Sequence, residues 1–369
     1  MAQKELYQRL MCYLAGVIIV LLTAGCSSRL RHNVEIIHDY PSIGKSMPNL
    51  PELQWQEKLF SPPDAIEILN DSTILVFTFR GELFLWNLNT GKKLGNIWQP
   101  YREPISSYLI AADRLYIGSV MEGDLTAFNF KTRKKVWRKK KFRVKPDAMA
   151  IIGDTLYIYN TMGLFALATD TGTELNKRKI RNRLTSGLIN AGNSLLAFGD
   201  NGYLFRYSTD LKLLYKTDLR MGTRIESSFY QNKIAAVDAN GRLVVYDLNQ
   251  NVIILEKQYD IPIYSQPYLT DQTLIVALSN GLVISYNCTT GEELWRHQGT
   301  GLINLPLRAT AAEIIVPFAR GHIVALSNNS GAELWRYNAE NVISHLSLTS
   351  NGIILIDRKY LIYFLKGGS

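Results

Sequence analysis

One short motif, with glycine as its second residue, recurs along this chain at a nearly constant spacing. Its seven glycines are Gly81, Gly123, Gly163, Gly202, Gly241, Gly281 and Gly321. Successive glycines lie 39 to 42 residues apart. A fixed period of this length over most of a chain indicates a repeat architecture, in which each unit buries its apolar face against its neighbours. The period therefore predicts one fold built from similar units rather than a set of unrelated domains.

Each unit has the same internal order of strands and turns. A β-rich run such as Thr273–Leu278 precedes the glycine, which occupies a tight turn, and the alternating run 282–286 follows it. A second turn, such as Thr290-Gly291, leads to a strand with tryptophan 14 residues after the repeat glycine, as at Trp137, Trp295 and Trp335. With a further apolar run, this makes four short strands per unit and predicts the blade of a β-propeller. We interpret the tryptophans as packing residues between blades.

The two ends of the chain predict how the propeller closes. The segment Asp357–Leu365 fits the middle strands of a last blade, but the chain stops at Ser369, before a tryptophan strand can form. Near the N-terminus, 53–57 resembles an isolated tryptophan strand around Trp55. Pairing of the two segments would remove open sheet edges. The prediction is an all-β fold, an eight-bladed propeller over residues 51–369, with seven blades as the alternative.

The first 25 residues have the features of a bacterial lipoprotein signal peptide. Lys4 and Arg9 precede the apolar run Leu10–Leu22, which is too short to span a bilayer comfortably. The run ends in Leu22-Thr23-Ala24-Gly25-Cys26, which resembles a lipobox. We therefore predict cleavage before Cys26 and lipidation of its thiol. The alternative is a plain signal peptide, or a membrane anchor, with a chance cysteine.

The segment after the cysteine predicts where the protein is held. By resemblance to lipoprotein sorting in Gram-negative bacteria, Ser27 favours the outer membrane, with the protein facing the periplasm. Residues 26–50 show no strand or helix period and contain Pro41 and Pro48. We expect this segment to be a flexible tether between the lipidated cysteine and the propeller.

The best-preserved repeats carry a family resemblance. The segment Gly281–Trp295 follows the pattern Gly-x-Leu, then Thr-Gly, then Leu-Trp, and Gly321–Trp335 follows it again. This pattern is similar to the repeat of pyrroloquinoline-quinone-type propellers. Together with the lipobox, the eight predicted blades and the length, it makes the chain resemble the BamB family of outer-membrane assembly lipoproteins. The resemblance implies a non-enzymatic scaffold that binds the POTRA domains of BamA.

The resemblance also implies which loops make the contact. The family has an arginine in a Leu-x-Leu-Arg-Gly stretch, 17 residues before an Asp-Asn-Gly turn, and Arg183 holds that place here. Leu184 stands where the family has glycine. Of a family pair of acidic residues at the start of the next blade, Glu226 is the one kept. We predict partner contacts at Arg181, Arg183 and Glu226.

The charge distribution gives a second candidate surface. Ten Lys or Arg residues lie between Lys131 and Lys145, and five more between Lys177 and Arg183. Counted from the repeat glycines, both runs fall at similar offsets, so we expect both on the outer strands and following loops of neighbouring blades. Arg143 and Lys145 would support partner binding electrostatically. The alternative function is recognition of an anionic glycan, a lipid headgroup or another protein by this basic surface. We expect no nucleic-acid partner.

Motifs for catalysis are absent from the sequence. The five histidines have no metal-ligand spacing, and Cys288 is the single cysteine outside the N-terminal segment. The chain contains no Gly-x-Ser-x-Gly elbow, P-loop or dinucleotide fingerprint. We therefore predict a binding protein with no cofactor and no metal, and keep a quinone-type enzyme as the weaker alternative.

Overall fold

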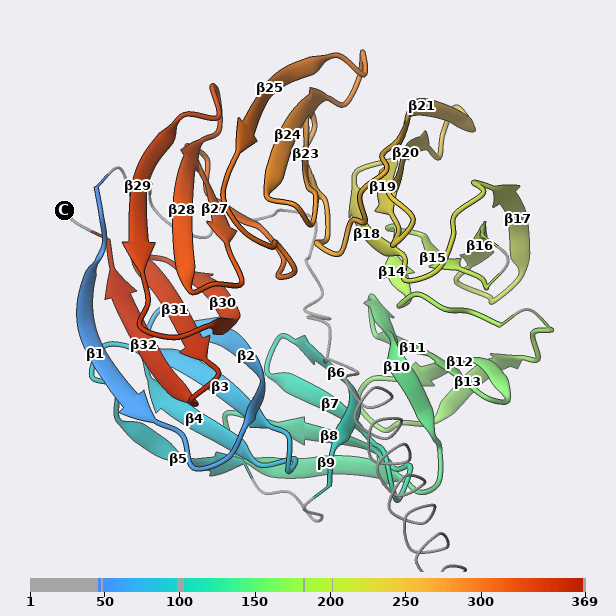
Figure 1. Cartoon of the computed structure of the whole chain (residues 1–369). Helices are drawn as coiled ribbons and strands as arrows, with labels where there is room; N and C mark the ends of the chain where they lie inside the picture. Colours follow the sequence, from blue (N-terminus) through green and yellow to red (C-terminus); the bar gives the residue numbers. More distant parts are fainter. Residues whose placement is uncertain (1–45, 48, 98–102, 182, 201, 368–369) are drawn as a thin grey trace, which may run out of the picture.

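The computed structural model describes residues 46–47, 49–97, 103–181, 183–200 and 202–367. Within these residues, every regular element is a β-strand, and the strands form eight four-stranded antiparallel sheets. Figure 1 shows the sheets arranged as blades around a common centre, in chain order. The predicted all-β, eight-bladed propeller is confirmed, and the seven-bladed alternative is wrong.

Blades 1 to 7 take their strands in chain order from the centre outward (Figure 1). Blade 1 consists of β2 (Pro63–Asn70), β3 (Thr73–Thr78), β4 (Leu83–Asn87) and β5 (Lys93–Ile97). Blade 2 consists of β6 (Ile105–Ala111), β7 (Arg114–Ser119), β8 (Leu125–Asn129) and β9 (Lys134–Lys139), and blade 3 of β10 (Val144–Ile152), β11 (Thr155–Asn160), β12 (Gly163–Ala168) and β13 (Glu174–Arg178). Blade 4 consists of β14 (Ile189–Asn190), β15 (Ser194–Phe198), β16 (Tyr203–Ser208) and β17 (Leu213–Asp218).

The remaining blades follow the same plan. Blade 5 consists of β18 (Glu226–Tyr230), β19 (Lys233–Val237), β20 (Arg242–Asp247) and β21 (Val252–Gln258), and blade 6 of β22 (Tyr268–Leu269), β23 (Thr273–Ala277), β24 (Leu282–Asn287) and β25 (Glu293–Gln298). Blade 7 consists of β26 (Arg308–Ala309), β27 (Glu313–Pro317), β28 (His322–Ser327) and β29 (Glu333–Asn338). Blade 8 consists of β30 (Ile343–Thr349), β31 (Gly352–Asp357) and β32 (Leu361–Lys366), with β1 (Glu52–Lys58) as its fourth strand.

The first and last strands of the chain close the ring. β1, which carries Trp55, pairs antiparallel with β32 from Glu52 opposite Lys366 to Lys58 opposite Leu361. In Figure 1 the blue N-terminal strand lies beside the red C-terminal strands. Closure gives blade 8 its fourth strand from the opposite end of the chain, so the ring holds together without a covalent link at this point.

The repeat glycines form the turns between the second and third strands. All seven have a positive φ, between 70° and 136°, a region that glycine enters without steric cost. The Gly321 N–H donates to the Phe318 carbonyl over 3.1 Å. In blade 8, which has no repeat glycine, Tyr360 takes this place with a φ of 66°, and its N–H donates to the Asp357 carbonyl over 3.1 Å. The eighth turn therefore has the same geometry without its glycine.

Four outer strands carry a tryptophan that fastens its blade to the next one. Their indole N–H groups donate to backbone carbonyls of the following blade over 2.7–2.9 Å: Trp55 to Leu88, Trp137 to Thr169, Trp295 to Asn328, and Trp335 to Met47. The ring of Trp295 packs on the turn at Gly331, where a Cβ would lie 2.4 Å from the ring. The predicted packing role of these tryptophans is confirmed.

Met47 completes the last of these contacts. Blade 8 lacks a turn before its fourth strand, because that strand is β1. Met47 lies there instead, with its side chain 2% exposed and its carbonyl accepting from Trp335. Ser46 donates to the Glu313 carboxylate over 2.5 Å. The packed chain thus includes residues that the sequence assigns to the tether.

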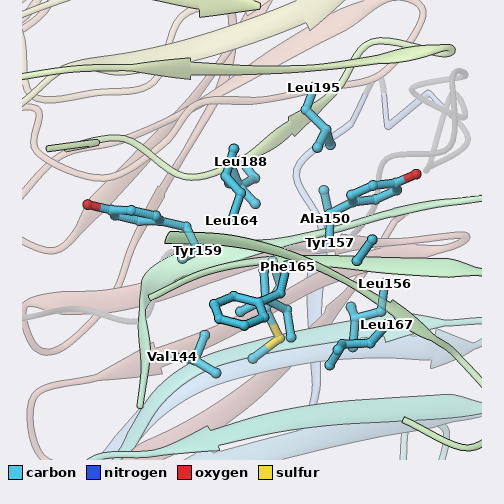
Figure 2. Packing of buried hydrophobic residues seen from close by; sticks show 14 of the residues in the cluster. Val144, Ala150, Leu156, Tyr157, Tyr159, Leu164, Phe165, Leu167, Leu188 and Leu195 are labelled. Carbon is cyan, nitrogen blue, oxygen red and sulfur yellow. The ribbon is translucent and has the colours of Figure 1, made fainter. Parts of the chain in front are cut away.

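Apolar side chains fill the space between adjacent blades. Figure 2 shows Leu156 and Phe165 of blade 3 in one buried cluster with Leu188 and Leu195, which lie before and in blade 4. The middle strands are buried along nearly their whole length because both faces of each sheet meet a neighbour, as in β31. The fold therefore depends on the blade interfaces, which leaves the loops at the ends of the blades free to vary.

Candidate partner-binding face

One face of the ring carries two kinds of loop. They are the turns between the second and third strands and the connectors between blades, and both emerge at the same end because the strands alternate in direction. Backbone N–H groups of the turns donate to connector carbonyls over 2.8–3.2 Å: Phe79 to Pro62, Asp200 to Arg183, Ala239 to Thr223, Ser279 to Pro262, and Ala319 to Leu302. We call this surface the connector face. Its backbone follows one scheme around much of the ring.

Arg143 and Arg183 occupy similar places in successive connectors of this face. The two residues are 40 positions apart, and both side chains are exposed. The Arg143 N–H donates to the Gly123 carbonyl over 2.6 Å, and the Arg183 carbonyl accepts from the N–H of Asp200. Hydrogen bonds to the turns therefore fix the backbone positions of both arginines, from which their side chains extend.

Basic residues are unevenly distributed among the described connectors of this face. Three successive connectors hold eight Lys or Arg residues and no Asp or Glu: residues 140–143, 179–188 and 219–225. The next three hold no Lys or Arg: residues 259–267, 299–307 and 339–342. These contain the acidic residues Asp260 and Glu340 instead. We call the turns of blades 1–4 with the first three connectors the basic half. The turns of blades 5–7 with the next three connectors are the neutral half.

The other predicted contact residues have different positions. Arg181 is exposed on the same connector as Arg183. Lys145 is the second residue of β10 and Glu226 the first of β18, and both are half-buried where the chain enters an inner strand. Glu226 therefore begins an inner strand, whereas the connector arginines lie outside the strands. Cys26 lies outside the described residues.

Two further arginines extend the basic half. Arg220 and Arg224 lie on the connector between β17 and β18, and both side chains are exposed. The Arg224 guanidinium lies 5.1 Å from the ring centroid of Tyr264, at a distance typical of a cation–π contact. This contact orients Arg224 toward the following connector. The sequence places Arg224 beside Glu226, but its role became visible only with the position of Tyr264.

Exposed apolar side chains lie between the basic connectors and before them. They are Phe60 (99% exposed), Phe79 (50%), Val120 (53%), Met121 (79%) and Met162 (56%), all on turns or connectors of blades 1–3. In the neutral half, the described large apolar side chain with comparable exposure is Leu302 (43%).

Sequence reasoning missed these apolar residues, although one signal was present. Phe79 and Met121 lie two residues before their repeat glycines, where the neutral half has Ala239, Ser279 and Ala319. Comparing residues at one offset across the repeats would have found them.

Hydrogen bonds connect the innermost strands of neighbouring blades. The Tyr108 hydroxyl donates to the Glu67 carboxylate, and Asn190 Nδ2 donates to the Ile151 carbonyl over 2.7 Å. Burial, and then the Glu67 carboxylate, raise the pKa of the Tyr108 hydroxyl well above its usual value. These polar groups therefore join one blade to the next.

Two searches of the described residues bear on other functions. In the part of the chain that the structure describes, no three His, Cys, Asp or Glu side chains gather as a metal site would require. The same part contains no helix of the length and apolarity needed to cross a membrane. Cys288 is buried, and its thiol donates to the Asp271 carbonyl over 2.9 Å.

Comparison with known families decides the relationship. The family model described as outer membrane protein assembly factor BamB matches residues 51–217 and 212–350. The chain belongs to the BamB family. The match begins just before β1 and extends into blade 8, so it takes in nearly the whole ring. Among curated proteins, no sequence matches the chain significantly.

Solved structures show how widely this fold is shared. BamB from Moraxella catarrhalis superposes with a TM-score of 0.66 and 16% identity, covering 86% of this chain and 100% of that one. The computationally designed Ika8 protein gives 0.72 and 15%, covering 86% and 99%. Sqt1 from Saccharomyces cerevisiae gives 0.70 and 12%, covering 87% and 100%. At these identities the likeness shows the fold alone. Membership of the BamB family rests on the family model.

Proposed function

We propose that this BamB-family chain is a non-enzymatic scaffold of the outer-membrane β-barrel assembly machinery, and that it binds the POTRA domains of BamA through the basic half of the connector face. Family membership supports a role in outer membrane protein assembly. The contrast between the two halves supports the location of the site. Cys26 would hold the protein on the outer membrane, facing the periplasm.

The observation that carries the site is that one backbone scheme bears two kinds of side chain. The turn of blade 6 donates from Ser279 to the carbonyl of Pro262, as that of blade 4 donates from Asp200 to Arg183. Small residues, Ala239, Ser279 and Ala319, donate in this scheme in the neutral half. The arginines and apolar side chains of the basic half are therefore not needed for folding, which points to a partner.

The chemistry of the basic half defines that partner. Guanidinium groups pair with carboxylates through two parallel hydrogen bonds, so Arg143, Arg181 and Arg183 fit a surface with acidic residues. Met121 and Met162 would lose exposed apolar area on docking, at roughly 25 cal/mol per Å². Arginine, methionine and aromatic residues are the types enriched in protein interfaces. The partner surface should thus have an apolar patch bordered by carboxylates.

Some polar groups of the inner strands and connectors have a structural role, as Gln266 does when its Nε2 donates to the Ser227 carbonyl of blade 5 over 2.7 Å. The BamB family, rather than the quinone-dependent enzymes that share its repeat, gives the matching model. We therefore propose no cofactor and no reaction for this site.

The test is capture of partners from solubilised outer membranes by the tagged mature protein, followed by mass spectrometry. Wild-type protein should retain BamA in near-equal amounts. The double variant Arg181→Glu/Arg183→Glu should bind isolated POTRA domains at least about tenfold more weakly, which corresponds to about 1.4 kcal/mol.

The matched control is Arg320→Glu, which reverses one exposed arginine in a turn of the neutral half. It should leave POTRA binding unchanged. Failure of the wild-type protein to retain BamA would reject the proposed partner. Equal losses in the double variant and in the control would reject the proposed site.

A further inference from the structure

We infer that the outer edge of blades 2 and 3 is a second binding surface, and that it attaches to an anionic lipid bilayer. This basic rim is separate from the connector arginines proposed to bind BamA. Its members lie on β9, on β13 and in the loop directly before β9: Lys131, Arg133, Lys134, Lys135, Lys139, Lys177 and Arg178. All but the half-buried Lys139 are exposed.

The charge of the protein is concentrated in this region. Residues 131–183 contain fifteen Lys or Arg and four Asp or Glu, a net charge of +11, whereas the whole chain carries +9. Of the four acidic residues, Asp147 is buried and Glu174 lies 3.6 Å from Lys177. The rest of the chain is close to neutral. The positive potential is therefore local and belongs to blades 2 and 3.

Comparison with other blades shows that the fold does not require this charge. In β25 and β29 the outer strand carries a glutamate two residues before the tryptophan, and Glu293 accepts from Arg296 over 2.6 Å. Lys135 stands at the corresponding place in β9, two residues before Trp137 and opposite Phe128 as Glu293 is opposite Tyr286. Outer strands of this fold can thus hold balanced charge, and β9 does not.

The composition of the rim favours lipid over a shaped protein surface. Five of its seven basic residues are lysines, whose compact charges on long flexible stems suit mobile phosphate groups. On the connector face arginine predominates instead. Val136 (39% exposed) and Leu175 (59%) lie among the lysines of β9 and β13 and can enter the headgroup region of a bilayer. A convex edge with diffuse charge and isolated apolar residues fits a fluid anionic surface.

The chain outside the described propeller allows this contact. The predicted lipidated Cys26 is 26 residues before Glu52, the first residue of β1. A segment of this length can extend at most about 90 Å. β1 belongs to blade 8, whereas the basic rim belongs to blades 2 and 3. The lipid anchor and the basic rim would therefore be two separate points of attachment. The rim would give a second attachment that orients the disc at the bilayer.

The experiment measures sedimentation of the chain from Ser27 onward with vesicles. This chain lacks the lipid but keeps every contact described within residues 46–367. One set of vesicles contains phosphatidylcholine alone, and the other contains phosphatidylglycerol as well. The protein should bind the second set, and added salt should weaken the binding. Each basic residue near an anionic bilayer strengthens attachment several-fold, so Lys131→Gln/Lys134→Gln/Lys135→Gln/Lys177→Gln should bind at least about tenfold more weakly.

The matched control is Lys92→Gln/Lys212→Gln/Lys257→Gln/Lys366→Gln, which removes the same charge from exposed lysines elsewhere. It should bind nearly as the wild type does, and both variants should keep the thermal unfolding temperature and POTRA binding of the wild type. Three results would overturn the inference: no binding of wild type to anionic vesicles, equal binding to neutral vesicles, or equal losses in the two variants. Any of these would leave an acidic protein or glycan as the partner of the rim.

Discussion

The two halves of the connector face have similar backbones and different surfaces. In both halves the turn of a blade donates an N–H to the connector before it, as Asp200 does to Arg183 and Ser279 to Pro262. The neutral half has Ala239, Ser279 and Ala319 at the donor position of its turns and no Lys or Arg on its three connectors. The basic half places Phe79, Met121 and Met162 on its turns and eight basic residues on its connectors.

This difference separates what the repeat requires from what the function adds. Glycine at the turn and packing at the blade interface are common to both halves, so they specify the propeller. Large exposed apolar and basic side chains occur in one half, where they contribute little to stability because they remain in water. In a repeat protein, departures from the repeat at exposed positions are thus the best guide to the binding surface.

The largest effect should come from a residue that serves the fold. Trp295 lies at the interface of blades 6 and 7, so Trp295→Ala removes a buried ring and a hydrogen bond to Asn328. We expect the free energy of unfolding to fall by about 3–5 kcal/mol, measured by urea denaturation. POTRA binding by the folded fraction should not change.

The neighbouring residue provides the control for this prediction. Leu294 precedes Trp295 on the same strand and is exposed. Leu294→Ala should change stability by less than about 0.5 kcal/mol. Similar losses in the two variants would contradict the role assigned to the tryptophans.

An exchange of turn residues between the halves should have the next largest effect. Phe79→Ala/Met121→Ser gives two turns of the basic half the residues found at the same offset in the neutral half. Loss of apolar burial should weaken POTRA binding by about 2 kcal/mol, roughly thirtyfold in Kd. Isothermal titration calorimetry measures this change, and thermal unfolding should remain as in the wild type.

The reverse exchange is the control. Ala239→Phe/Ser279→Met gives the neutral half the apolar residues of the basic half, and it should leave POTRA binding unaltered. If it weakens binding as much as the first exchange does, the two halves are not functionally different.

A smaller effect should appear in the salt dependence of POTRA binding. Higher ionic strength screens exposed charges, so it should weaken binding by the wild-type protein. The same change in salt should affect Arg181→Glu/Arg183→Glu less, because the favourable pairs are already lost. Equal salt dependence in the two proteins would show that these arginines do not face carboxylates of the partner.

The smallest effect concerns the stability of the protein at low pH and involves the outer strands of blades 6 and 7. Hydrogen bonds from Arg296 and Arg336 hold the pKa values of Glu293 and Glu333 below the usual 4.5. A carboxyl whose pKa is lower in the folded state stabilises the fold above its unfolded pKa, and this contribution disappears as the pH falls through the folded value. Glu293→Gln/Glu333→Gln should therefore flatten the stability profile below pH 4.5 slightly, in thermal denaturation. Because these pairs are largely exposed, a large change would contradict this assignment.

Much of the fold could be predicted from the sequence because its determinants are local and repeated. The seven repeat glycines predicted seven blades. The isolated Trp55 strand, paired with the other end of the chain, predicted the eighth. The role of Met47 could not be foreseen, since it replaces a turn that blade 8 lacks and has no repeat equivalent.

The candidate site was predictable only in part. The equivalence of Arg143 and Arg183 followed from their offsets, because offset determines place in a blade. The exposure of Phe79 and Met121 did not, because apolar residues near a turn are as consistent with burial as with exposure. The contact of Arg224 with Tyr264 joins residues 40 positions apart in different blades, and no pattern in the sequence indicates it.

The most direct test of the account is photo-crosslinking in cells from one repeat position in both halves of the connector face. A photoreactive amino acid replaces Met162, or replaces Asn240 or Asn280, each of which directly precedes its repeat glycine. The account predicts crosslinks to BamA from position 162 and none from positions 240 and 280. Crosslinks to BamA from the neutral half, with none from position 162, would contradict it.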